Sequence, residues 1–186
     1  MNNFKISSAI VTALLLAALP LCAQEKKRIS PHETVTATIA GAQIKIVYGR
    51  PYTKDPKSGA MRKIWGGLVP FGQIWRMGAD EATLLTTNHD IEIGAAKIPA
   101  GTYSLYLQPE DSGSAQLIVN EQTGQWGTKH DASQDFVSIG MKRNPVAPAV
   151  NQFTIVLDQN PDGTGGTLRL KWEETEFSAP ITVAKS

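Results

Sequence analysis

Stretches in which apolar and polar residues alternate follow one another along most of the chain. Between Glu33 and Ile39, Val35, Ala37 and Ile39 fall on one side and threonines on the other, which is the two-residue period of a half-buried strand. No stretch shows the 3.6-residue period of a long amphipathic helix, and no internal repeat is evident. The pattern predicts strands at Glu33–Ile39, Gln43–Tyr48, Ala82–Thr87, Asp90–Ile93, Thr102–Gln108, Ala115–Asn120, Phe136–Lys142, Gln152–Asp158, Thr167–Trp172 and Glu176–Val183.

Many short strands joined by turn residues are typical of antiparallel all-β folds. We therefore predict one all-β domain over residues 31–186, a single antiparallel β-sandwich of the jelly-roll or immunoglobulin-like kind, with a barrel as the alternative. Gly41 supplies the turn of a first hairpin. Pro180 lacks an N–H, so the last strand is expected at the edge of a sheet.

Three segments interrupt the alternation. Residues 50–63 hold two prolines, a glycine and several cations, and predict a long surface loop. The loop leads into Ile64–Thr87, which concentrates tryptophan, glycine and charged residues that a plain strand does not need. Residues 121–135, around Trp126, are polar and rich in turn formers, and predict a bulged loop or a short helical turn.

The N-terminus has the features of a secretory signal peptide. Lys5 precedes an apolar run from Ala9 to Leu21, which is too short to span a bilayer comfortably and ends at small residues. We predict a leader over residues 1–23 and an exposed tether over residues 24–30, and hence export to the periplasm or the extracellular space. Lipidation of Cys22 is the alternative to its removal with the leader, and Leu21 is larger than the small residue such a signal requires.

Composition narrows the possible partners. The chain has 186 residues with 18 Lys and Arg against 17 Asp and Glu, and Lys5 belongs to the leader, so the mature domain is formally neutral. Neutrality argues against nucleic acid and against an anionic membrane surface. Cys22 is the one cysteine, which leaves a mature chain without disulfides or thiol chemistry.

Four segments carry a resemblance to a known family: YGRP at 48–51, LVPFGQIWRMGADEAT at 68–83, IPAGTYSLY at 98–106 and LRLKWEETEFSAPI at 168–181. Together, and in this order, they resemble the bacterial family of unknown function DUF2911. The resemblance implies export and a β-rich fold, and it transfers no catalytic residue. The family more often has Thr at the position of Met77 and Asn at that of Asp80, which weakens any role for Asp80 as a carboxylate.

Charged residues around the Trp-rich stretch are the first candidates for a site. Asp80 and Glu81 would point to opposite faces of an extended chain, so the two are not expected to act as a paired acid and base. An ion pair of Glu81 with Arg76 or Arg50, holding the long loop on the sandwich, is the favoured interpretation.

Aromatic residues offer a second kind of site. Tyr48, Trp65, Trp75 and Trp126 would make a platform for sugar faces or peptide side chains if they were exposed, and otherwise they fill the core. Trp172 is expected in the core in either case.

Metal and cofactor signatures are weak. His32, His89 and His130 are widely separated, so a zinc site would have to be assembled by folding alone. The DQNPDG segment at 158–163 matches half of a calcium loop, but Arg169 stands where the bidentate Glu is required. We predict neither a metal nor a cofactor.

The sequence holds no GxSxG elbow, SxxK pair, phosphate-binding GxxxxGK[ST] or dinucleotide-binding GxGxxG, and we assign no catalytic residue. The favoured hypothesis is a non-catalytic module that binds a small molecule, a glycan or a protein. The alternative is a hydrolase of cell-envelope material that uses Glu81 with Arg76 or Arg50. The predicted ligand-binding residues are Tyr48, Arg50, Trp65, Trp75, Arg76, Asp80 and Glu81.

Overall fold

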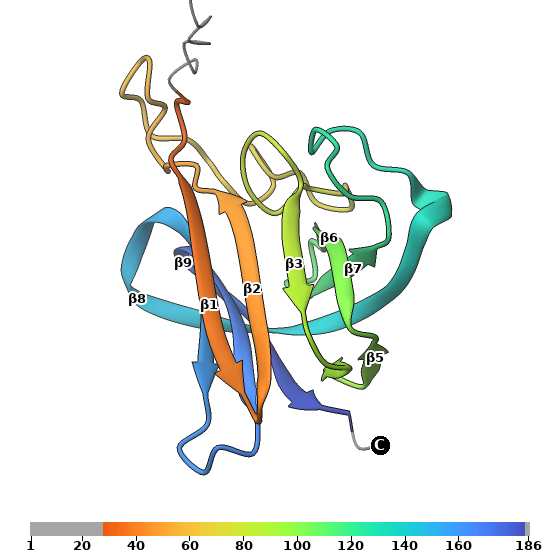
Figure 1. Cartoon of the computed structure of the whole chain (residues 1–186). Coiled ribbons are helices and arrows are strands. Elements are labelled where there is room, and N and C mark those ends of the chain that lie inside the picture. The colour runs from red at the N-terminus through yellow and green to blue at the C-terminus, as the bar shows by residue number, and fades with distance from the viewer. Residues whose placement is uncertain (1–27, 185–186) are drawn as a thin grey trace, which may run out of the picture.

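A computed structural model describes residues 28–184, and within them the chain is built from β-strands (Figure 1). The strands are β1 (His32–Ile39), β2 (Ala42–Gly49), β3 (Thr83–Thr87), β4 (Ile91–Ile93), β5 (Ala96–Ile98), β6 (Gly101–Pro109), β7 (Ala115–Asn120), β8 (Asp135–Gln159) and β9 (Gly166–Val183). One turn of 3-10 helix, η1 (Ala132–Gln134), precedes β8. The predicted leader and Cys22 lie outside the described residues.

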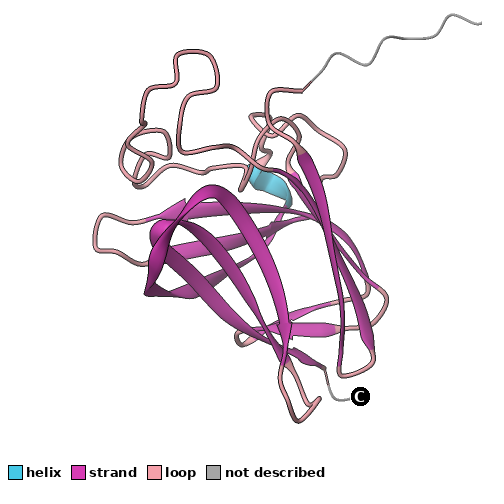
Figure 2. Ribbon diagram, turned by 90° about the vertical axis from the view of Figure 1, so that its left-hand side faces the viewer, coloured by secondary structure: helices cyan, strands magenta, loops and turns pink. Residues whose placement is uncertain are grey.

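All strand pairs are antiparallel, in the order β1-β2-β3-β6-β7-β8-β9-β4-β5. Residues 135–141 of β8 pair with β7, and residues 142–159 pair with β9, so this one long strand passes from one layer to the other (Figure 1). β1 contacts β8 and β9 across the interior, and Figure 2 shows the two layers facing each other. No ladder among the described residues joins β1 to β5, so the sheet is not closed into a barrel and the sandwich prediction is confirmed.

Alternation along the strands fills the space between the layers. Ile44, Ile46 and Tyr48 of β2 are buried, whereas Gln43 and Lys45 are exposed, as the sequence pattern predicts. Removing such side chains from water contributes about 1.5–3 kcal/mol each. Trp172 of β9 is fully buried, which confirms its predicted place in the core.

Three features of the sheet differ from the prediction. The segments around residues 135–159 and 166–183 each form one long, bent strand instead of two short ones, because register shifts let the ladder continue past its irregular positions. β5 was not predicted. β9 lies between β8 and β4, so the expected edge position of Pro180 is wrong; Pro180 falls after the pair Lys142–Ser178 and before Ile93–Ile181, where a missing N–H removes no ladder hydrogen bond.

The long connection between β2 and β3, residues 50–82, lies at the end of the molecule where β1 begins (Figure 1). Isolated bridges tie it to the sheet, among them Tyr52 with Gln152 and Trp75 with Leu107. The predicted loop at residues 50–63 is thereby confirmed. Across residues 28–184, no helix has the length and apolar character required to cross a bilayer.

Candidate functional site

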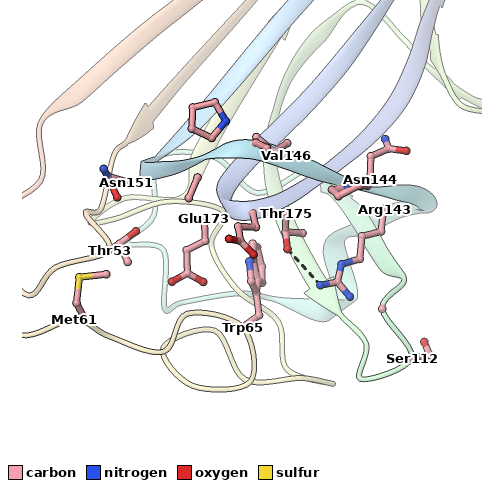
Figure 3. A pocket seen from close by; sticks show the side chains of 16 residues that line it. Thr53, Met61, Trp65, Ser112, Arg143, Asn144, Val146, Asn151, Glu173 and Thr175 are labelled. Atoms are coloured by element: carbon pink, nitrogen blue, oxygen red, sulfur yellow. Dashed lines mark hydrogen bonds between the residues drawn. The ribbon is translucent and has the colours of Figure 1, made fainter.

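A cavity of about 1200 Å³ opens where β8 and β9 lose their regular pairing. Residues 143–149 of β8 and 173–175 of β9 form two of its walls, and Thr53, Met61 and Trp65 of the long loop form another. Figure 3 shows Glu173 and Arg143 projecting into this space from the two strands, with Trp65 between them in that view. A concave site lined by both rings and polar groups is the usual place for a ligand.

Glu173 is the most unusual residue of the cavity. Its φ of 52° is in the left-handed region, which bulky side chains rarely adopt, and it pairs with Val150 between the two register shifts. Among the described residues, its half-buried carboxylate has no hydrogen-bond or ion-pair partner. Desolvation and then the negative charge of Glu174 raise the pKa of the Glu173 carboxyl. The site therefore offers an unsatisfied oxygen acceptor to a ligand.

Arg143 places hydrogen-bond donors on the same side of the strands as this carboxylate (Figure 3). The Arg143 Nη2 donates to Thr175 Oγ1 at 3.3 Å, and its Nη1 lies so close to Gly113 that a Cβ at that glycine would come within 3.0 Å. On the other face of β8, Asn144 Nδ2 donates to Glu176 Oε1 at 3.2 Å and to Ser178 Oγ at 3.0 Å, which ties β8 to β9 beside the cavity (Figure 3). These bonds fix the polar wall of the cavity before any ligand arrives.

The aromatic residues of the Trp-rich stretch pack together instead of forming an open platform. Trp65 meets Trp75, Trp172 and Phe177 edge-on at centroid distances of 6.2, 6.3 and 5.2 Å. Trp75 stacks on Trp172 at 5.7 Å. Half-buried Trp65 still lines the cavity, whereas Trp126 is 48% exposed and pairs with Glu81 through the backbone, away from this cluster.

Tyr48 and Arg50, both predicted site residues, hold β8 against β2. The buried Tyr48 hydroxyl donates to Glu33 Oε2 at 3.2 Å and accepts the Ile155 N–H at 2.9 Å. Desolvation raises the pKa of Tyr48 to about 12. Arg50 pairs with Glu33 at 2.7 Å and donates to Phe153 O at 3.1 Å and Thr154 Oγ1 at 2.7 Å. Neither side chain lines the large cavity.

Asp80 and Glu81 lie on the same side of the chain, and the expectation of opposite faces is wrong. Asp80 has φ of 66°, so the backbone turns at this residue instead of running extended. The predicted partner of Glu81 is also wrong. Its carboxylate accepts two hydrogen bonds from Arg28, and this pairing is the main cause of the lowered pKa of Glu81.

Arg76 runs along Gly127, where any Cβ would overlap its side chain. Its Nε is buried and has no hydrogen-bond partner among the described residues. Together with Trp75 and Asp80 it lines a second cavity of about 460 Å³. The predicted residues are thus divided: Trp65 lines the large cavity, Trp75, Arg76 and Asp80 line the small one, and Tyr48, Arg50 and Glu81 make internal contacts.

Sequence reasoning missed Glu173 and Arg143 in the cavity, and also His32, which folding places beside Asp80 and Glu81. One signal was present for Glu173. The alternation of Thr167–Trp172 stops at the doubled Glu173–Glu174 and resumes at Glu176, which is the sequence mark of a bulge.

Fold and cavity together define a class: an all-β, sandwich-like domain with an open polar and aromatic cavity at a bulged strand junction. The chain belongs to the family described as "Protein of unknown function (DUF2911)", whose model matches residues 30–181, and the resemblance seen in the sequence is confirmed. Comparisons with curated proteins and with solved structures gave no match.

Proposed function

We propose that this protein is an exported binding module that takes a small polar ligand, a saccharide, into the cavity between β8 and β9. The observation that carries the proposal is the Glu173 carboxylate, which is half-buried, has no partner among the described residues and is held in a strained backbone conformation. Strain of this kind persists where the surrounding structure maintains it, and it is concentrated at ligand sites.

The lining supports a saccharide in particular. Sugar hydroxyls donate hydrogen bonds to a carboxylate and accept them from donors such as Arg143, while the apolar face of a sugar ring packs on an aromatic or proline surface. Trp65, Pro145 and Pro148 supply such surfaces beside Glu173. One cavity therefore presents both types of contact that a saccharide uses.

The hydrolase hypothesis has less support. Glu81 is occupied by Arg28, and Arg50 is occupied by Glu33 and by the backbone of β8. Glu81 and Arg50 are thus engaged elsewhere, which leaves Arg76 without its assigned catalytic partner, and we favour binding over hydrolysis.

Export is a separate part of the proposal and rests on the leader at residues 1–23. Mass spectrometry of the native N-terminus distinguishes a chain that begins at Gln24 from one that keeps an acylated Cys22 or the intact leader. An intact leader in the native protein would contradict export through this segment.

Saccharide binding is tested by a thermal-shift screen of the purified protein against mono- and oligosaccharides, followed by calorimetry on the compound that gives the largest shift. A ligand specific to the folded state raises the melting temperature by mass action. Glu173→Gln removes the charge and keeps the shape, so we expect it to weaken binding at least tenfold, about 1.4 kcal/mol.

The matched control is Glu121→Gln, which changes an exposed carboxylate outside the cavity lining and is expected to bind as the wild type does. Equal affinity of Glu173→Gln and the wild type would contradict the assigned role of Glu173. If no saccharide shifted the melting temperature, the ligand class would be wrong.

A further inference from the structure

A compact group of one histidine and two carboxylates lies at the opposite end of β1 from the first hairpin turn. His32 begins β1, and Asp80 and Glu81 come from the long loop just before β3. One donor atom from each, the His32 Nε2, Asp80 Oδ2 and Glu81 Oε2, lies within 4.8 Å of the other two. The left-handed backbone at Asp80 brings its carboxylate to the same side as that of Glu81.

A positive charge already sits among these donors. Arg28 Nη1 contacts the same three atoms: it lies 3.0 Å from His32 Nε2 and 3.8 Å from Asp80 Oδ2, and it is hydrogen-bonded to Glu81 Oε2. All three atoms thus contact one cationic nitrogen. This convergence on a single point distinguishes the group from a loose cluster of surface acids.

We propose that His32, Asp80 and Glu81 form a site for a divalent transition-metal ion, such as Zn²⁺, and that Arg28 competes with the ion for it. The site is independent of the saccharide cavity, because His32, Asp80 and Glu81 are absent from the lining of that cavity. It also goes beyond the sequence pattern, which gave no metal-ligand spacing.

The distances suit an ion of this kind. Metal–ligand bonds of about 2.0–2.1 Å in tetrahedral geometry separate two ligand atoms by roughly 3.4 Å. His32 Nε2 lies 3.2 Å from Asp80 Oδ2 and 3.6 Å from Glu81 Oε2. One imidazole with two carboxylates, and a fourth position left open, is a donor set that zinc accepts and that magnesium and calcium, which prefer oxygen alone, do not favour.

Neither a proton on His32 Nε2 nor the Arg28 guanidinium gives all three ligand atoms a favourable contact at once. Arg28 only donates, so its contact with His32 is a hydrogen bond when Nε2 carries no proton. The contact of Nε2 with Asp80 is a hydrogen bond only when Nε2 does carry one. A metal ion accepts a lone pair from all three at once, which removes this conflict.

The test is a zinc titration of the purified, tag-free protein against a chromophoric chelator of known affinity. The expected result is one tightly bound ion, with binding weakened at least tenfold in His32→Gln and in Glu81→Gln. His89→Gln is the matched control, because His89 is an exposed histidine outside the group, and it should leave zinc affinity unchanged. Arg28→Ala removes the competing cation and should tighten binding at least threefold.

Several outcomes would overturn the proposal. Absence of zinc binding in both the wild type and Arg28→Ala would exclude the site, and unchanged affinity in His32→Gln and Glu81→Gln would place the ion elsewhere. Equal zinc affinity of Arg28→Ala and the wild type would exclude the competition. Melting temperatures of all variants, measured without zinc, show that each is folded, and Glu173→Gln should bind zinc normally whether or not saccharide binding holds.

Discussion

At the scale of single residues, Glu173 combines a strained backbone, which lowers the stability of the fold, with a place in the lining of the large cavity. A left-handed conformation costs a residue with a Cβ about 1–2 kcal/mol, and Asn tolerates it better than Glu. Nothing in the described contacts of the Glu173 side chain offsets this cost, because its carboxylate has no partner there. The strain therefore has no compensation within the fold, which favours a role for the Glu173 side chain in binding a ligand in the cavity.

We predict that Glu173→Asn raises the free energy of unfolding by about 0.5–1 kcal/mol, because the strain at φ 52° is reduced. Denaturant unfolding measures the change. Glu174→Asn is the control: its backbone is not left-handed, and Asn is poor in strands, so no gain is expected there. If Glu173→Asn were no more stable than Glu174→Asn, the claim that the left-handed backbone at Glu173 lowers the stability of the fold would be wrong.

Tyr48 gives a prediction about alkaline pH. The pKa of its hydroxyl rises from the ordinary 10.0 to about 12, chiefly through burial, so folding favours the neutral form. This contribution to stability is complete below about pH 10, the unfolded pKa, and is lost as the pH rises through about 12. The loss amounts to about 2–3 kcal/mol at 1.36 kcal/mol per pKa unit.

The measurement is the free energy of unfolding of the wild type and of Tyr48→Phe between pH 9 and about 12. The advantage of the wild type over the variant should shrink across that range. Burial also raises the pKa values of Tyr103 and Tyr106, but their effect is common to both proteins and cancels in the difference. Parallel curves for the two proteins would show that Tyr48 is not protected from ionisation.

At the scale of elements, the end of β2 and the long loop are in direct backbone contact. Gly49 O accepts the Ala79 N–H at 3.2 Å, and a Cβ at Gly49 would overlap the Ala79 carbonyl. The loop segment that carries Arg76, Asp80 and Glu81 therefore lies against β2 only because residue 49 has no side chain.

Gly49→Ala is predicted to destabilise the fold by about 1–3 kcal/mol, since backbone has to move to admit the methyl group. Gly140→Ala is the matched control, because the nearest atom to its added Cβ would be Gln116 Nε2 at 4.0 Å. Thermal unfolding of the two variants compares them. Equal melting temperatures would mean that the loop adapts to the added methyl group without cost.

At the scale of the whole molecule, the alternation of apolar and polar residues predicted those features of the fold that are determined by residues close together in the sequence. The hairpin of β1 and β2, the strand β7 and the burial of Trp172 all follow from local pattern, because a two-residue period fixes which face is apolar. The continuity of β8 as one long strand could not be predicted from local pattern, because it depends on the pairing of β8 with both β7 and β9.

The candidate sites were less predictable because their residues meet only through tertiary contacts. His32 reaches Asp80 across 48 positions of sequence, and Arg28 reaches Glu81 across 53. The left-handed turn at Asp80 reversed the expected direction of a side chain, and no local signal marks a non-glycine residue for that conformation. Sequence reasoning located the long loop correctly and assigned its ion pair to the wrong arginine.

The most direct test of the central claim is NMR mapping of the saccharide selected by the thermal-shift screen onto the assigned backbone amides of the protein. The proposed site predicts shift changes concentrated at the non-proline residues of 143–149, at 173–175 and at the Trp65 indole N–H, with the same changes in Glu121→Gln and their loss in Glu173→Gln. Changes confined to other surfaces, or changes that persist unaltered in Glu173→Gln, would contradict a ligand site between β8 and β9.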